Sequence, residues 1–307
     1  MQISQFNRRL KPWMLPIAMV CGVFFHDALN HAQWAVPYLI FTMLLITFCR
    51  VRPSDLRIDG MIWRLLLVQL VGTVTVFVVL RPVDLSLAQS VMICVLCPTA
   101  TAAPVVTGML GGSIGKVASY SIVSNIMAAL LAPAMFVWCG SGSEISFFEE
   151  FMLISMKVAP MIVFPLGLAM MLYFSAPKIH AFVADAQKIT FYLWSVSLLL
   201  VVGKSVSFVL AEPKGAIPLM VAIAFCAGVV CLLQFYIGRR IGLRYNHPIS
   251  CAQGLGQKNT VLAVWMAVNY LNPISSIGPA AYIAWQNSIN SLQIYLKMKR
   301  EGRTNEG

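Results

Sequence analysis

Apolar runs about as long as a bilayer is thick, joined by short polar loops, fill almost all of this 307-residue sequence. Because about 20 apolar residues cross the hydrocarbon core as a helix, we count ten spans, at 12–28, 34–49, 61–80, 86–111, 115–138, 151–174, 188–210, 215–237, 248–271 and 276–296. Only 11% of the residues are charged, whereas a soluble domain has about 25%. The sequence therefore predicts an all-α integral membrane protein with ten transmembrane helices.

The loop charges give the orientation of these spans. With ten spans, all loop Lys and Arg residues except Arg81 and Lys214 fall on the side of the N-terminus. By the positive-inside rule both termini are cytoplasmic, and we expect a multi-pass protein of the cell (inner) membrane. This separation explains the excess of 22 Lys and Arg over 11 Asp and Glu, so we expect no nucleic-acid partner.

The spans divide evenly about the loop 141–150, with five before it and five after it. An odd number of spans per half makes the second half insert upside down relative to the first. We therefore expect two inverted five-helix repeats, at 1–140 and 151–297, and a charged cytoplasmic tail at 298–307.

Two prolines interrupt the fourth span within residues 97–107. Pro98 and Pro104 free backbone carbonyls inside the membrane, and such groups persist only within protein or beside a watery cavity. A plain proline kink is the alternative to a binding site here. The candidate site residues of this interruption are Thr99, Thr101 and Thr107.

A second interruption, at 248–264, places a lysine in the ninth span. Burying Lys258 in mid-membrane costs about 2.5–3.5 kcal/mol, and no Asp or Glu lies deep in any predicted span. An ammonium without a carboxylate partner favours a bound anion, or a lysine that releases and regains a proton. The alternatives are that Lys258 extends to a membrane surface or caps freed carbonyls. The other candidate site residues of this interruption are Gln253, Gln257, Asn259 and Thr260.

The two interruptions open with Cys97 and Cys251, which lie half a chain length apart. Paired helix breaks in matching halves are typical of transporters with inverted repeats, whose half-helix N-termini bind anionic groups.

Polar residues also share one face of the fifth span and one face of the tenth. They either line a cavity or join helices through hydrogen bonds, and Gln69 in the third span is a weaker candidate. The two groups are Ser121, Ser124 and Asn125, and Gln286, Asn290 and Gln293. We take Ser124, Asn125 and Asn290 as candidate site residues.

Enzymatic chemistry has no visible place in the sequence. There is no phosphate loop, metal cluster or nucleophile–base pair, so we expect no catalytic residue, no metal and no enzyme activity. Cys94 and Cys97 have redox or metal spacing, but no second pair completes a site. We therefore expect the eight cysteines to have packing roles.

With these features the chain resembles the bile acid:sodium symporter family. The matching residues are Pro98, Thr101, Ala102, Gly112, Leu130, Leu131, Ala132, Pro133, Gly256, Asn259, Leu262 and Ala263. The resemblance implies a panel of spans 1, 2, 6 and 7 and a core of spans 3–5 and 8–10, in which spans 4 and 9 cross. It also implies sodium bound behind the crossing and organic anions, such as bile acids, bound between the two parts.

The departures from this family concern the sodium ligands. The glutamate shared by both sodium sites falls at Gly254, and the glutamine before the asparagine is Lys258. The Ser-Asn pair aligns with Ala103 and Pro104, and a hydroxyl pair aligns with Asn125 and Ala129. We hypothesise that Lys258 substitutes for the coupling ion and expect no cofactor, although sodium is implied by the resemblance.

The function expected from the sequence is secondary active transport of a small organic anion by alternating access. The anion is bile-acid-like or another carboxylate or sulfonate, and the other partner is the lipid bilayer. The main alternative is a non-transporting receptor or scaffold that retains the symporter fold, and a channel is the third.

Overall fold

The computed structural model describes residues 14–50, 59–140, 147–211 and 214–304, and nearly all of these residues are helical. Four helices are long and apolar enough to cross a membrane: Gly60–Leu80, Ile114–Cys139, Phe151–Ser175 and Ile217–Leu243. The chain is therefore an all-helical membrane protein. Among the described residues the only β-type pairing is an isolated antiparallel bridge between Thr99 and Lys258.

The chain divides into two compact units. Unit 1 comprises residues 1–50 and 164–216, and unit 2 comprises 51–163 and 217–307. Helix α9 (Phe147–Ser175) contributes to both.

Unit 1 is organised around α11 (Gln187–Ala211), which packs against four other α-helices and one 3-10 helix of this unit. Ser207 of α11 accepts a hydrogen bond of 2.9 Å from the side chain of Asn30. The Gln33 amide donates to the Leu200 carbonyl at 2.8 Å. The other elements of the unit are α2 (Met14–Phe24), α3 (His26–Asn30), η2 (Gln33–Ala35), α4 (Val36–Cys49), α10 (Pro177–Asp185) and η4 (Lys214–Ala216).

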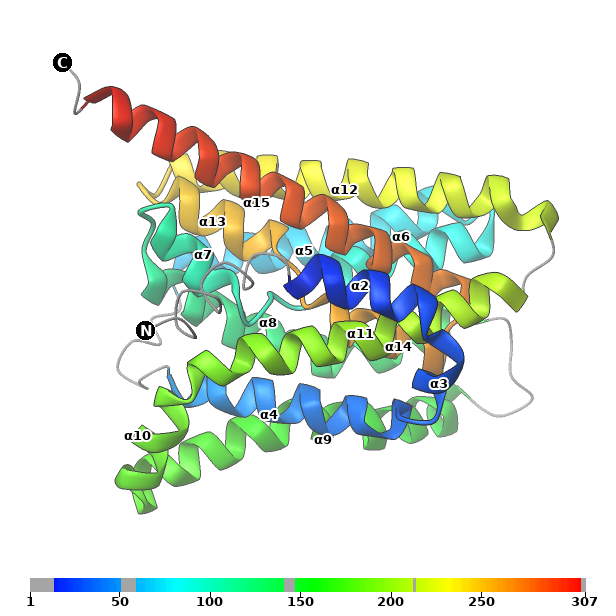
Figure 1. Ribbon diagram of the computed structural model, residues 1–307, viewed down its shortest axis with the longest axis horizontal. Helices are drawn as coiled ribbons and strands as arrows, with labels where there is room; N and C mark the ends of the chain where they lie inside the picture. The colour runs from blue at the N-terminus through cyan, green and yellow to red at the C-terminus, as the bar shows by residue number, and fades with distance from the viewer. Residues whose placement is uncertain (1–13, 51–58, 141–146, 212–213, 305–307) are drawn as a thin grey trace. The chain divides into compact units, whose positions relative to one another are not determined.

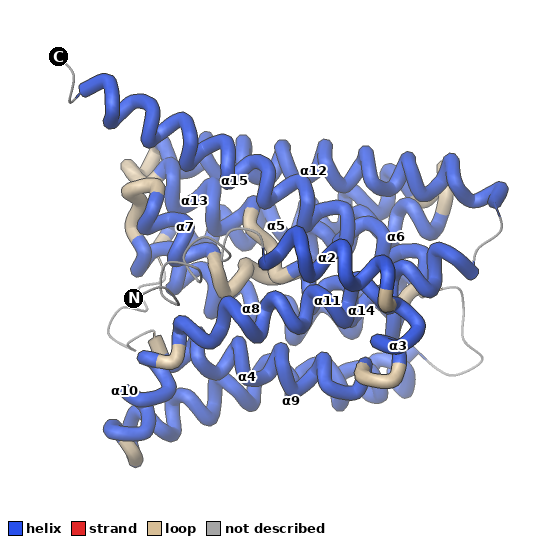
Figure 2. Tube along the Cα trace, in the orientation of Figure 1, coloured by secondary structure: helices blue, strands red, loops and turns tan. Residues whose placement is uncertain are grey.

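Unit 2 contains the two interrupted helices. The predicted fourth span is formed by α6 (Leu85–Leu96) and α7 (Ala103–Met109), and the ninth by α13 (Pro248–Gly256) and α14 (Thr260–Tyr270). Figure 2 shows the intervening residues as loop between helices. The remaining elements are α5 (Gly60–Leu80), α8 (Ile114–Cys139), α12 (Ile217–Leu243), η5 (Pro273–Ser276) and α15 (Ile277–Thr304).

Close packing of α12 on α13 holds the second interrupted helix in place, and the two lie side by side in Figure 1. Gly238 and Gly242 make this approach possible, because a Cβ atom at either position would collide with the backbone of residues 247–252. Gly256 likewise leaves room for the ring of Phe235, which would lie 2.5 Å from a Cβ atom there.

The helices differ from the expected ranges at several places. Each of the ten ranges contains a helix or a pair of helices, but α12 continues to Leu243 and α15 continues to Thr304, into the segment expected to be a tail. An additional helix, α10, lies between the sixth and seventh ranges, where a loop was expected. The first range is divided into α2 and α3.

Candidate functional site

The two interruptions meet each other inside unit 2. The backbone amide of Ala100 donates to the carbonyl of Gln257 at 2.9 Å, and the amide of Asn259 donates to the carbonyl of Pro98 at 2.8 Å. Together with the bridge between Thr99 and Lys258, these bonds join the breaks as two short antiparallel segments. We call this contact, residues 97–100 with 256–259, the crossing.

The side chains at the centre of the crossing also bond in a reciprocal way. The Thr99 hydroxyl donates to the carbonyl of Gly254 at 2.7 Å, and the Lys258 ammonium donates to the carbonyl of Val95 at 2.9 Å. A rotation about a local two-fold axis that places Thr99 on Lys258 would also place Val95 on Gly254, so the two contacts occupy equivalent positions. Each contact satisfies a carbonyl that a helix end leaves without an intrahelical partner.

Lys258 is completely inside the protein, with 1% of its surface exposed. It therefore does not extend to a membrane surface, which was one alternative reading of the sequence. It does cap a freed carbonyl, which was the other. An ammonium has three N–H donors, and Val95 is the only hydrogen-bond acceptor of this one within the described part of the chain. No ion pair between described residues includes Lys258.

Gln69 of α5 also binds the carbonyls at the end of α6. Its side-chain NH₂ group donates to the carbonyls of Leu96 and Cys97, at 2.8 and 3.0 Å. Its oxygen accepts from the hydroxyls of Tyr120 and Ser124, at 2.6 and 3.1 Å. Gln69 is fully buried with its hydrogen-bonding capacity used, which the sequence, where it was an isolated amide, did not show.

A second glutamine–tyrosine pair supports the other interruption. The Tyr282 hydroxyl donates to the carbonyl of Gly256 at 2.7 Å and accepts from the Gln234 amide at 3.0 Å. Gln234 also donates to the carbonyl of Cys94 at 3.3 Å. Consecutive carbonyls at the end of α6 thus receive donors from α5, α12 and the ninth range.

The tenth range contributes an amide group. The side-chain oxygen of Gln286 accepts from the backbone amide of Lys258 at 2.9 Å. The Gln253 amide donates to Asn290 at 3.0 Å and to Gln293 at 2.9 Å. Of the two roles left open for this polar face, the structure shows hydrogen bonds between helices, and it shows the same for Ser124.

Several predicted site residues have unused hydrogen-bonding atoms. The buried side-chain atoms without a protein partner include Oδ1 of Asn125, Oε1 of Gln253, Oε1 of Gln257 and Nδ2 of Asn259. Thr260 is buried directly after the crossing, and its backbone amide bonds to the Lys258 carbonyl.

The structure does not bring all three threonines of the first interruption to the same place. Thr99 lies in the crossing, and Thr101 is partly exposed in the turn after it. Thr107 lies by the turn between α7 and α8, where its methyl group would contact a Cβ atom placed at Gly112, and its buried hydroxyl has no partner. It belongs to that turn and not to the crossing.

The described residues contain no group of three or more His, Cys, Asp or Glu that could hold a metal ion. All eight cysteines are free. The Cys97 thiol donates to the Asn259 carbonyl at 2.9 Å, adding another contact across the crossing. No protein-family model matches this chain, and a comparison with curated proteins finds no match either.

Proposed function

We propose that this protein is a secondary active transporter of a small organic anion that works by alternating access. In this proposal the chain has ten spans in two inverted repeats, is similar to the bile acid:sodium symporters, and resides in the inner membrane with both termini cytoplasmic. The reciprocal bonds of the crossing support an inverted repeat, because a local two-fold axis would relate Thr99 to Lys258 and Val95 to Gly254.

The observation that carries the proposal is the buried ammonium of Lys258 at the contact between two interrupted helices. The C-terminal ends of α6 and α13 carry partial negative charge. When it is protonated, Lys258 places a full positive charge against one of these ends. We infer that this tethered charge does the work of a coupling cation, so that transport is sodium-independent or linked to protons.

The chemistry around the crossing suits an anion. Nδ2 of Asn259 is a buried donor without a protein partner, at the N-terminus of α14. A helix N-terminus favours a negative charge, and a carboxylate or sulfonate oxygen would supply the missing acceptor. Of the three N–H groups of the Lys258 ammonium, one donates to a carbonyl of the described residues. The remaining N–H groups could bind the oxygen atoms of the same class of ligand.

The test begins with a thermal-shift screen of organic anions across pH 5–9, with and without sodium, because a ligand of the native state stabilises it. Uptake of the best ligand is then measured in sealed proteoliposomes. We expect saturable, sodium-independent accumulation that is lost in Lys258→Gln. Sodium-dependent uptake that persists undiminished in Lys258→Gln would refute the role of Lys258.

The same experiment separates the alternatives. A receptor or scaffold that retains the fold binds the anion but does not accumulate it across the sealed membrane. A channel shows conductance without saturation. Either result rules out the carrier.

A further inference from the structure

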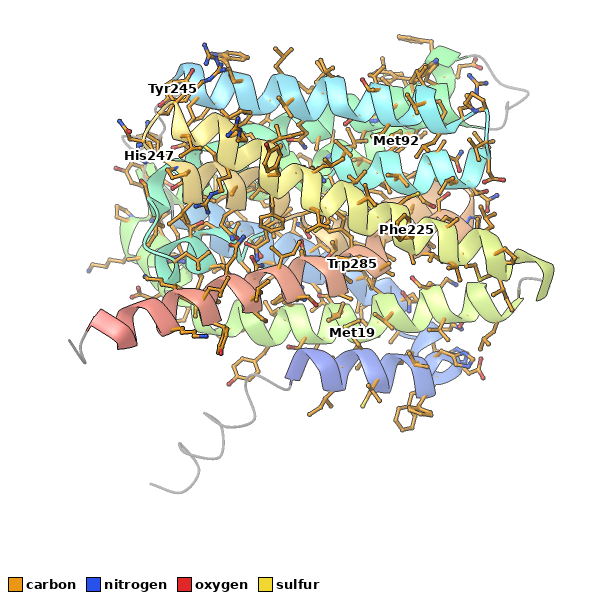
Figure 3. The ribbon with its side chains drawn as sticks, turned by 90° about the horizontal axis from the view of Figure 1, so that it is seen from above. Met19, Met92, Phe225, Tyr245, His247 and Trp285 are labelled. Carbon is orange, nitrogen blue, oxygen red and sulfur yellow. The ribbon has the colours of Figure 1, made fainter. Side chains whose placement is uncertain are left out.

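Arginine side chains gather where the first turns of α5 meet the end of α12. Ile237, Ile241 and Tyr245 pack against the buried cluster that contains Met61 and Ile62. This packing forms a seam between the two helices. Figure 3 labels Tyr245 beside His247 at this end of α12.

Three exposed arginines lie next to the seam residues along α5 and at the end of α12. Arg64 of α5 lies over the ring of Tyr245, with 5.3 Å between the guanidinium carbon and the ring centroid. Arg240 lies 5.9 Å from the ring of Tyr236 in the same way. Arg244 follows in the turn after α12. Stacking on an aromatic ring fixes the plane of a guanidinium while leaving its N–H groups free to bind.

No carboxylate of the described residues forms an ion pair with these arginines. Asp59, which precedes α5, is paired with Lys116 instead. Within the described residues, the positive charge of the seam therefore has no carboxylate partner, and it lies next to the exposed apolar side chains of Trp63 and Leu243. Aromatic residues and arginines at a helix end are typical of the interface between hydrocarbon and headgroups.

We propose that the seam binds the headgroup of an anionic phospholipid. The phosphate lies against Arg64, Arg240 and Arg244, and the acyl chains lie along the exposed apolar surfaces of α5 and α12. Planar guanidiniums match phosphate oxygens through paired hydrogen bonds. This site is separate from the crossing and does not depend on transport.

The experiment compares lipids on the purified, delipidated protein in detergent. Phosphatidylglycerol and phosphatidylcholine with the same acyl chains are titrated, and binding is followed by native mass spectrometry. We expect tighter binding of phosphatidylglycerol. Because a basic residue near an anionic lipid surface contributes about 1 kcal/mol, which is roughly a fivefold change in affinity, Arg64→Gln and Arg240→Gln should each weaken it by about that factor.

Arg239→Gln is the matched control, because Arg239 is also exposed and neighbours Arg240 in sequence but lies on a different face of α12. We expect its lipid affinity to stay at the wild-type value. An equal loss in Arg239→Gln, or equal binding of the two lipids, would overturn the proposal. Stabilisation by inorganic phosphate as strong as that by phosphatidylglycerol would also overturn it, because the site would then bind a free anion and not a lipid. The three variants change exposed residues, so we expect them to fold like the wild type. Unchanged thermal unfolding without lipid confirms this.

Discussion

Thr99 and Lys258 lie opposite each other in the crossing, and each donates a hydrogen bond to a carbonyl near the end of the helix that precedes the other. The positions are equivalent, but the groups are not, because one is a neutral hydroxyl and the other an ammonium. A hydroxyl is evidently sufficient for the structural task, since Thr99 performs it for Gly254. Capping the Val95 carbonyl therefore does not require the charge of Lys258. This is the reason to look for a role of the charge in ligand binding.

Replacing Lys258 separates the cap from the charge. Lys258→Met and Lys258→Thr both remove the ammonium, but only threonine retains a hydroxyl, placed as in Thr99. We expect Lys258→Thr to be more stable than Lys258→Met by about 1–3 kcal/mol, the cost of leaving the buried carbonyl of Val95 unpaired. Reversible unfolding in mixed micelles measures the difference. Equal stabilities would show that the carbonyl does not depend on this contact.

Thr99→Val tests the equivalent contact on the other side. Valine has almost the same shape but cannot donate to the Gly254 carbonyl, so we expect a loss of about 1–3 kcal/mol in the free energy of unfolding. Thr101→Val is the matched control, because the partly exposed Thr101 forms no such bond to the crossing. The same loss in both variants would contradict the assignment.

Most of the helices could be predicted from the sequence, because long apolar runs indicate where a helix can cross a bilayer, but α10 and the extensions of α12 and α15 were missed. The two interruptions could also be predicted, since Pro98 and the glycines around Lys258 weaken a helix whatever surrounds them. The number ten for the spans stays a prediction, because four of the helices that the structure describes are long and apolar enough to cross a membrane by themselves.

The pairing of the interruptions could not be predicted in detail. The sequence showed only that Cys97 and Cys251, which open the two interruptions, lie half a chain length apart, whereas the backbone hydrogen bonds pair Thr99 with Lys258. Backbone bonds determine this register, and they leave no mark on residue types. The role of Gln69 was also missed, because its four hydrogen-bond partners come from segments that are distant along the chain.

Gln69 and Tyr120 should be energetically coupled. Tyr120→Phe removes one donor from the Gln69 oxygen, and Gln69→Leu leaves the carbonyls of Leu96 and Cys97 without their donor. Each change alone should destabilise the protein, and the double variant should be less affected than the sum by about 0.5–3 kcal/mol. A double-mutant cycle of unfolding free energies checks this. Strict additivity would mean that the two side chains act independently.

The ion pair between Asp59 and Lys116 should make stability depend on acid pH. Burial opposes ionisation of Asp59, but hydrogen bonds from Lys116 and from the Ile62 amide outweigh it and lower the pKa of the carboxyl below its ordinary value. Because the folded-state pKa is the lower one, the stabilisation is complete above the ordinary pKa of about 4 and is lost as the pH falls through the folded value. Thermal unfolding followed from pH 6 down to about pH 2 should show this loss. Lys116→Gln should reduce the slope, and an unchanged slope would exclude the pair as its source.

Gly238 determines how closely α12 approaches α13. A Cβ atom there would collide with the carbonyl of Cys251 and lie 2.9 Å from the Cα atom of Ala252. Both are backbone atoms, which cannot move aside without shifting α13 and the crossing that follows it. We therefore expect Gly238→Ala to lower the free energy of unfolding by about 1–3 kcal/mol, as overpacking does.

The control is Gly115→Ala. Nothing lies within 4 Å of the new atom there, and the better helix propensity of alanine should stabilise the protein by about 0.5–1 kcal/mol. Both changes in the free energy of unfolding are measured in the same mixed micelles. A loss in Gly238→Ala together with a gain in Gly115→Ala would show that the stability of this unit depends on the close approach of α12 and α13. Changes of the same sign would argue against it.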